Sequence, residues 1–492
     1  MKLDTVSGYI RIPTLKTVDR FLEELRSHSI PIPCEPEWLP VSRSPISQPS
    51  ELFGRKLCNR FAIQPMEGWD ADAFGAPTEH TYRRWRHYGA SGASVIWGGE
   101  AVAVREDGRA TSRQLLLSKA TQTGIAGLLE CLKKERKRIA SDDNVVIGLQ
   151  LTHSGRFSHP HGANHDPVIL YHHPILDPKF NIPGDYPVMS DGEIRRLEED
   201  FVEAAILAYE IGFDFVDIKH CHGYLGHEFL SAKTRDGQYG GSLENRTRFL
   251  KNVTEGVCAN APGLGIGVRC SVFDVIPYRP DPETSLPGKP GKGVPEEYSN
   301  GDYHRWAFGS DHVHPTEPDL SEAMELFDIF RKLSICLVNV TAGSPYYNPH
   351  IQRPALYPPS DGYLPPEDPL WGVFRQMNAV RELKRCFPDI VMIGSALTYL
   401  QDFLPNVAQA ALREGWMDFV GIGRMVLAYP SYVRDLLEGK PLDRKKICRT
   451  FSDCTTAPRN GFPSGCYPLD PYYKKSSMAK DLAQIKKGSS AN

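Results

Sequence analysis

Several titratable side chains crowd the stretch 217–231, which begins at the end of a short apolar run. Lys219, His222 and Tyr224 lie close together there, and each can donate a hydrogen bond. Donors of this kind polarise a substrate oxygen and protonate a neighbouring carbon, which is general acid catalysis. From the pattern alone, the alternative is a hydrogen-bonded histidine pair in the core, formed by His220 and His222.

Strand-like and helix-like segments alternate along most of the chain. Eight short runs, most of them rich in valine and isoleucine, predict strands buried on both faces, at 60–64, 94–97, 145–151, 215–219, 265–270, 335–340, 390–393 and 419–422. Helical spacing follows them at 79–91, 121–140, 190–211, 243–259, 320–332, 369–386, 398–414 and 430–438. This alternation predicts an α/β fold, a (β/α)8 TIM barrel. A doubly wound open sheet is the runner-up, and it is disfavoured because no strand is followed by a glycine-rich dinucleotide fingerprint.

The expected barrel spans residues 44–440, between an N-terminal helical extension at 1–43 and a C-terminal extension and tail at 441–492. Three connections exceed the usual few residues, at 152–189, 272–319 and 341–368. Each leaves the C-terminal end of a strand, where barrel active sites lie, so we expect these long loops to cover a substrate. For the insertion at 272–319, a disordered surface loop is an equal alternative.

Composition excludes several classes of partner. With 41% hydrophobic and 24% charged residues, the chain has an ordinary globular composition. A net charge of -3 without a basic stripe argues against nucleic acid, and no apolar run reaches the roughly 20 residues that span a membrane. The N-terminus lacks the apolar core of a signal peptide, and an odd count of 11 cysteines predicts a reduced, cytoplasmic protein. We therefore expect a small-molecule substrate and no membrane partner, and a homo-oligomer stays open.

Motifs in a fixed order along the chain resemble the Old Yellow Enzyme family of NAD(P)H-dependent ene-reductases. The central signature is His222-Gly-Tyr-Leu225, then Phe229-Leu-Ser231, then Tyr-Gly-Gly-Ser-Leu-Glu-Asn-Arg at 239–246. Further matches fall at 59–61, 64–66, 99–101, 150–156, 267–269 and 421–424. The resemblance covers roughly residues 44–440 and implies bound FMN, NAD(P)H as reductant, and reduction of an activated C=C bond by a ping-pong mechanism.

The resemblance also implies roles for the residues that contact the substrate. Tyr224 matches the proton donor, and His222 matches one of two donors to the substrate oxygen. Lys219 replaces the second donor, where the family has His or Asn, and its charge would suit an anionic substrate group. Glu67 stands where the family often has Thr or Cys; it either alters the redox potential or points away.

For the cofactor, the resemblance implies that Arg269 lies near the N1–O2 edge of the flavin and that Gln150 bonds its pyrimidine edge. The residues expected to pack on or beside the ring are Pro65, Met66 and Ala101. The residues expected at the phosphate, at the ends of the seventh and eighth strands, are Gly394, Ser395, Ala396, Gly423 and Arg424.

Two further features point to metals and are set aside. Cys448, Cys454 and Cys466 lie where longer family members carry an iron–sulfur cluster, but such a cluster takes four thiolates, so we expect none. The histidines of 153–173 lack ligand spacing, so no metal site is expected. Two alternative functions stay open: an FMN-dependent dehydrogenase, demethylase or redox-neutral isomerase, and a flavin-binding barrel without catalysis.

Overall fold

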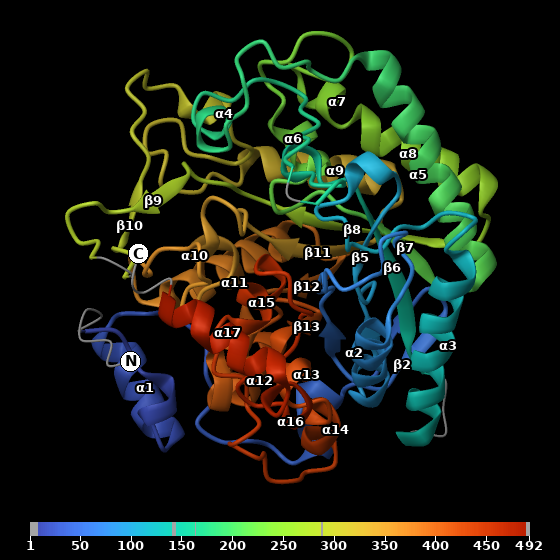
Figure 1. Ribbon diagram of the computed structural model, residues 1–492. Coiled ribbons are helices and arrows are strands. Elements are labelled where there is room, and N and C mark those ends of the chain that lie inside the picture. The colour runs from blue at the N-terminus through green and yellow to red at the C-terminus, as the bar shows by residue number, and fades with distance from the viewer. Residues whose placement is uncertain (1–7, 140–143, 163, 287–288, 489–492) are drawn as a thin grey trace.

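An eight-stranded parallel barrel forms the centre of the molecule (Figure 1). The computed structural model describes residues 8–139, 144–162, 164–286 and 289–488. The barrel strands are β3 (Phe61–Ile63), β4 (Val95–Ile96), β6 (Val146–Thr152), β7 (Phe215–Ile218), β8 (Gly265–Ser271), β11 (Leu337–Thr341), β12 (Val391–Gly394) and β13 (Phe419–Ile422). Each strand pairs in parallel with its neighbours, and β4 joins β6 to close the ring. The predicted (β/α)8 barrel is confirmed, and all eight strands lie where they were expected.

The second barrel strand has an interruption that the sequence prediction missed. After β4 the chain turns and then resumes as β5 (Ala101–Ala103), which pairs with the upper part of β6. Gly98 and Gly99 make this turn with positive φ, where side chains are strained, and a Cβ on Gly98 would lie 2.6 Å from the Gln150 backbone nitrogen. The turn therefore lets the strand end come close to Gln150.

Helices surround the barrel, as predicted. The outer helices are α2 (Glu79–Ala90), α3 (Gln122–Ile139), α5 (Asp191–Ile211), α8 (Arg248–Asn260), α9 (Ser321–Lys332), α11 (Pro369–Cys386), α12 (Leu404–Arg413) and α14 (Tyr432–Leu437). Two predicted helices are each divided. Residues 243–259 form α7 (Leu243–Arg246) and α8, and residues 398–414 form a 3-10 helix (Leu397–Phe403) followed by α12. Pro405 lies in the first turn of α12, where a missing N–H costs nothing, so a new helix begins there.

Large apolar side chains fill the lower part of the barrel. Trp97 and Phe215 pack edge to face with ring centroids 5.2 Å apart, and Ala62, Leu337 and Phe419 join the same cluster. An antiparallel hairpin, β1 (Ser50–Leu52) and β2 (Arg55–Leu57), adds Leu52 and Leu57 to this cluster. The interior is thus a packed core, which leaves the upper, C-terminal ends of the strands for a site.

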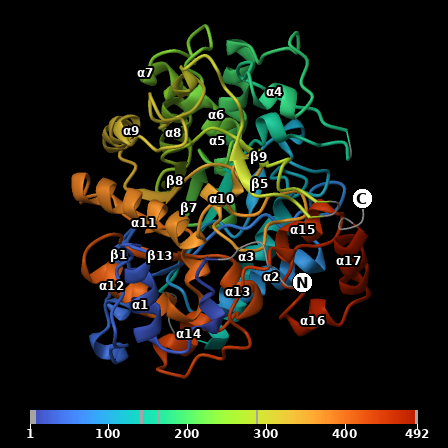
Figure 2. The ribbon, with the colours of Figure 1, turned by 90° about the vertical axis from the view of Figure 1, so that its left-hand side faces the viewer.

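Both ends of the chain pack against the barrel. Helix α1 (Val18–Ser27) buries Phe21, which stacks on Phe403 with ring centroids 4.4 Å apart. The C-terminal segment forms three helices that the sequence analysis did not predict, α15 (Asp453–Arg459), α16 (Pro471–Lys474) and α17 (Ser477–Gly488). Helices α15 and α17 lie side by side in Figures 1 and 2, joined by a 2.7 Å ion pair between Lys486 and Asp453.

The three long loops lie over the upper end of the barrel. They carry short elements, namely α4 (Leu176–Lys179), β9 (Tyr278–Pro280), β10 (Gly293–Pro295) and α10 (Pro349–Gln352). β9 and β10 form an antiparallel hairpin, and Trp306 Nε1 donates to the Tyr298 hydroxyl at 2.8 Å. The insertion is therefore ordered over its described residues, so the disordered alternative is wrong for that part; residues 287–288 lie outside it. Within the described residues, no helix is long and apolar enough to cross a bilayer.

Candidate active site

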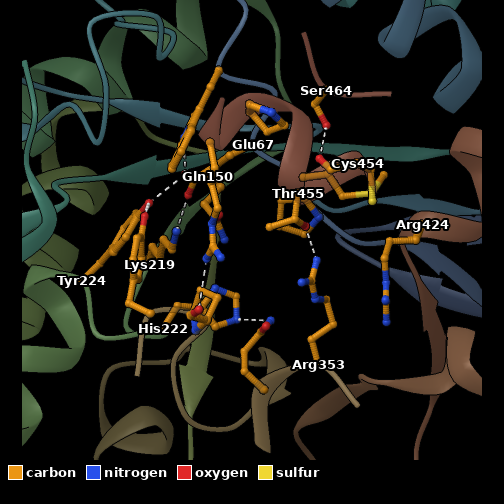
Figure 3. A pocket seen from close by; sticks show the side chains of 18 of the residues that line it. Glu67, Gln150, Lys219, His222, Tyr224, Arg353, Arg424, Cys454, Thr455 and Ser464 are labelled. Carbon is orange, nitrogen blue, oxygen red and sulfur yellow. Dashed lines mark hydrogen bonds and ion pairs between the residues drawn. The ribbon is translucent and has the colours of Figure 1, made fainter. Parts of the chain in front are cut away.

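A cavity of about 890 Å³ opens at the C-terminal ends of the barrel strands (Figure 3). Part of this space is open to solvent. The fold brings eight of the predicted residues together around it, namely Pro65, Met66, Gln150, Lys219, His222, Tyr224, Arg269 and Arg424. Glu67, which the sequence left undecided, also lines the cavity.

The other five predicted residues lie at neighbouring strand ends and do not line this cavity. Ala101 pairs with Gln150 in the β5–β6 ladder. Gly423 precedes α13 (Arg424–Ala428), and a Cβ added to Gly423 would lie 3.3 Å from Met66 Sδ. Gly394 and Ser395 accept hydrogen bonds from the Gln64 side chain, each at 3.2 Å. Ala396 follows with a φ of 68°. Their assignment to a phosphate stays a prediction.

Glu67 connects two of the predicted catalytic residues. Lys219 Nζ lies 2.7 Å from Glu67 Oε1, and the Tyr224 hydroxyl donates to Glu67 Oε2 at 2.7 Å. Trp69 Nε1 also donates to Glu67 Oε2, at 3.0 Å. Because the Tyr224 proton points at Glu67, the Tyr346 hydroxyl, 2.9 Å away, donates to Tyr224. The result is a hydrogen-bonded chain from Tyr346 through Tyr224 and Glu67 to Lys219.

The surroundings of Tyr224 in this hydrogen-bonded network keep it a protonated phenol. Burial raises the pKa of Tyr224 well above its usual value, and the negative charge of Glu67 raises it further. Lys219 Nζ lies 3.7 Å from the centroid of the Tyr224 ring, in a cation–π contact. The positive charge of Lys219 is thus shared between Glu67 and Tyr224. It is not free to pair with a substrate anion, whereas the sequence had suggested that it would suit one.

His222 lies on the same side of the cavity as Tyr224 and Lys219 (Figure 3). Its φ of 67° is a strained, left-handed value for a non-glycine residue, and strain of this kind is concentrated at functional sites. Its backbone is held by Ser271 Oγ, which accepts from the His222 N–H at 3.1 Å. Burial, together with the charges of Arg269 and Lys219, lowers the pKa of His222, so the imidazole is neutral.

Arg269 and Gln150 lie near the ends of β8 and β6, and the buried Asp217 accepts a hydrogen bond from each. The Gln150 amide donates to Asp217 Oδ2 at 2.5 Å, and the Arg269 backbone N–H donates to Asp217 Oδ1 at 2.7 Å. With its NH2 group committed to Asp217, Gln150 presents its oxygen as an acceptor. Burial lowers the pKa of Arg269, whose Nε has no partner among the described residues.

One wall of the cavity comes from the C-terminal extension, which sequence reasoning did not place at the site. Its lining residues are Cys454, Thr455, Pro458, Arg459 and Ser464. The long loops add Tyr346, Gln352 and Arg353, also missed. Cys454 was singled out as part of a cysteine group, and it borders a smaller neighbouring cavity with Cys448 and Cys466. Among the described residues, no group of three or more His, Cys, Asp or Glu side chains is placed to hold a metal ion.

The polar groups of the cavity fit a flavin nucleotide. Arg269 would supply a cation for the negative charge of a reduced flavin ring, and Gln150 would supply an acceptor for a ring N–H. Arg424 would supply a guanidinium for the phosphate, and its buried Nη1 has no partner among the described residues. Buried donors without partners are costly, so a ligand that accepts from them is expected.

We expect Glu67→Gln to lower the free energy of unfolding by about 2 kcal/mol, because Lys219, only 2% exposed, loses its counter-ion. The cost stays below that of a fully buried pair because the Glu67 side chain is 18% exposed. Urea unfolding followed by tryptophan fluorescence measures the change. The control is a double variant, Glu67→Gln with Lys219→Met, which removes both charges and should recover most of the loss. Equal stability of Glu67→Gln and the wild type would show that the pair contributes nothing.

The fold and site define a class, the (β/α)8 barrels with a basic cavity at the C-terminal ends of their strands. Comparison with known proteins narrows this class. Residues 46–282 match the model of the NADH:flavin oxidoreductase / NADH oxidase family. The NADPH dehydrogenase of Bacillus subtilis strain 168 is 33% identical over 215 residues, which is 42% of this chain and 58% of that protein. Residues 46–282 are thus similar to this NADH:flavin oxidoreductase family, in agreement with the resemblance that the motifs carry.

Solved structures share the fold. The old yellow enzyme homologue of Zymomonas mobilis superposes with a TM-score of 0.55 at 22% identity, covering 81% of this chain and 94% of that one. Histamine dehydrogenase from Rhizobium sp. 4-9 gives a TM-score of 0.61 at 18% identity, covering 87% of this chain and 53% of that one. The matched part of the chain spans just over half the length of its first curated relatives, 58% for each of two Bacillus proteins.

Proposed function

We propose that this chain is an NAD(P)H-dependent FMN oxidoreductase that reduces an activated C=C bond, such as that of an α,β-unsaturated carbonyl compound. The observation that carries the proposal is the buried, protonated Tyr224, which lies in one cavity with the neutral His222 and with Arg269. Gln150, Arg269 and Arg424 would hold FMN, which would supply hydride transfer from NAD(P)H to the β-carbon of the substrate. The match of residues 46–282 to the NADH:flavin oxidoreductase family supports this cofactor.

The residues of the chain would do the rest of the chemistry. His222 would donate a hydrogen bond to the substrate oxygen, which stabilises the negative charge that develops there. Tyr224 would give its hydroxyl proton to the α-carbon, and Tyr346 already donates to the oxygen that becomes negative. Lys219, over the Tyr224 ring, offsets the charge of that oxygen. Lys219 would thus act through Tyr224.

An absorbance spectrum of the purified protein tests this function. We expect flavin bands that bleach on anaerobic addition of NADPH or NADH and return when an enone such as cyclohex-2-enone is added. A colourless protein that does not take up FMN would overturn the proposal. Bands that bleach with NAD(P)H but return only when oxygen is admitted would refute alkene reduction. They would still support reduction of the flavin by NAD(P)H.

A second candidate is FMN-dependent dehydrogenation, and the contact between Tyr224 and Glu67 favours it specifically. The Tyr224 hydroxyl lies 2.7 Å from Glu67 Oε2, so Tyr224 can take a proton from a substrate while it passes its own proton to the carboxylate. In that case the bound flavin would resist reduction by NAD(P)H and bleach with the electron-donating substrate instead. The same spectrum therefore separates the two candidates.

A further inference from the structure

The cavity carries more positive charge than its negative side chains offset. Lys219, Arg269, Arg353, Arg424 and Arg459 line it, against a single lining carboxylate, Glu67. Lys219 is paired with Glu67, and Arg459 is paired with Asp361. Under the proposed function, Arg269 faces the flavin ring and Arg424 faces its phosphate. Arg353 is left without an assigned counter-charge.

The surroundings of Arg353 are unusual for an arginine inside a protein. Its Nη1 donates to Thr455 Oγ1, its buried Nε has no partner, and no carboxylate pairs with it among the described residues. Two further cations, Arg424 and Arg459, act on it, and they are opposed by the carboxylate Asp361, which is itself paired with Arg459. Burial and the charge of Arg424 lower the pKa of Arg353 to about 9, which leaves it charged at neutral pH.

Arg353 is half-buried, with its Nε fully buried. A partly desolvated cation without a counter-ion is costly, and a ligand can supply the missing charge. The planar fork of a guanidinium matches the two oxygens of a carboxylate or phosphate. Arg353 also lies near His222 in the fold, because the preceding residue, Gln352, places its side-chain Nε2 3.2 Å from His222 Nε2. An anion on Arg353 would therefore lie near the group that is expected to polarise the substrate.

We propose that Arg353 is an anion-binding residue of this cavity, and that the group it takes is a carboxylate or phosphate of the substrate. The inference rests on the proposed function for the identity of the substrate pocket. It replaces Lys219 with Arg353 as the cation that selects an acidic substrate. The phosphate of FMN is the other source of the same chemistry, and Figure 3 shows Arg353 and Arg424 on the same side of the cavity, so the test must separate the two sources.

The test uses oxidised, FMN-loaded protein and two probes of one shape, the anion cinnamate and the neutral cinnamamide, with affinities from titration calorimetry. We expect the wild type to prefer cinnamate. Arg353→Gln should weaken cinnamate binding by about 10- to 100-fold and leave cinnamamide within about threefold. Arg353→Lys, which keeps the charge, should retain part of the preference. Arg459→Gln is the matched control in the same wall, and its charge is already offset by Asp361.

A second measurement follows FMN release from the same proteins on dilution, by flavin fluorescence. We expect Arg353→Gln to release FMN like the wild type, whereas Arg424→Gln releases more. Release by Arg353→Gln equal to that by Arg424→Gln would assign Arg353 to the cofactor phosphate and overturn the substrate assignment. Equal loss for both probes, no loss, or the same loss in Arg459→Gln would also overturn it. Whether NADPH bleaches Arg353→Gln tests the proposed function separately.

Discussion

Tyr224→Phe is expected to slow reoxidation of the reduced flavin by cyclohex-2-enone about 10²- to 10⁴-fold, the usual worth of a positioned general acid. Reduction of the flavin by NADPH should stay within about twofold of the wild type, because that step needs no proton from Tyr224. The substitution keeps the ring and removes only the hydroxyl that lies between Glu67 and Tyr346. Anaerobic stopped-flow absorbance at the flavin band measures each half-reaction separately.

The control for this variant is Tyr346→Phe. It removes the donor to the Tyr224 oxygen but leaves the 2.7 Å bond from Tyr224 to Glu67. The loss of one hydrogen bond costs about 1 kcal/mol, so reoxidation should slow by about tenfold or less. If Tyr224→Phe reoxidises as fast as the wild type, Tyr224 is not the proton donor, and the α-carbon takes its proton from another group or from solvent.

Arg84→Met is expected to lower the free energy of unfolding by about 3–5 kcal/mol, the largest stability effect we anticipate from a single substitution. The Arg84 side chain is 2% exposed, and its Nη2 contacts both Asp70 Oδ1 and Glu100 Oε1 at 2.7 Å. Without Arg84, two carboxylates stay buried with no cation between them. Burial already raises the pKa of Glu100 to about 7, against the opposing charge of Arg84. Urea unfolding monitored by circular dichroism measures the change.

The matched control for Arg84→Met is Arg20→Met, which breaks an ion pair between Arg20 and Glu23 whose side chains are about 60% exposed. An exposed pair contributes at most about 1 kcal/mol, so this variant should unfold close to the wild type. A triple variant, Arg84→Met with Asp70→Asn and Glu100→Gln, removes the stranded charges and should recover much of the loss. Similar stability of Arg84→Met and Arg20→Met would refute the role of the buried network.

The same network positions the active site, so Arg84→Met should also disturb function. Glu100 Oε2 accepts from the Gly68 backbone N–H at 3.1 Å, next to Glu67 in the chain. Arg84 Nη1 donates to the Ser464 carbonyl at 3.2 Å, which fixes the C-terminal wall of the cavity. Arg84 fills the space beside Gly68, where an added Cβ would lie 1.7 Å from its Nη2.

Local patterns were enough to predict the barrel and much of the site. Strands buried on both faces are continuous apolar runs, so all eight could be located from the positions of such runs in the sequence. Because parallel strands all end at one rim of a barrel, residues that follow different strands had to meet there. Gln150, Tyr224, Arg269 and Arg424 line one cavity for this reason.

Only the tertiary structure decided which charges pair within the site. Lys219 and Glu67 are separated by 152 positions, and no periodicity relates them; their 2.7 Å contact depends on how two strand ends face each other. The sequence predicted a C-terminal extension without a role at the site, yet this extension lines the cavity and brings Thr455 to Arg353. Sequence determined which side chains reach the rim, because strand order is local. Their partners, and hence the cation left for a substrate, depend on packing between distant segments, which no local pattern encodes.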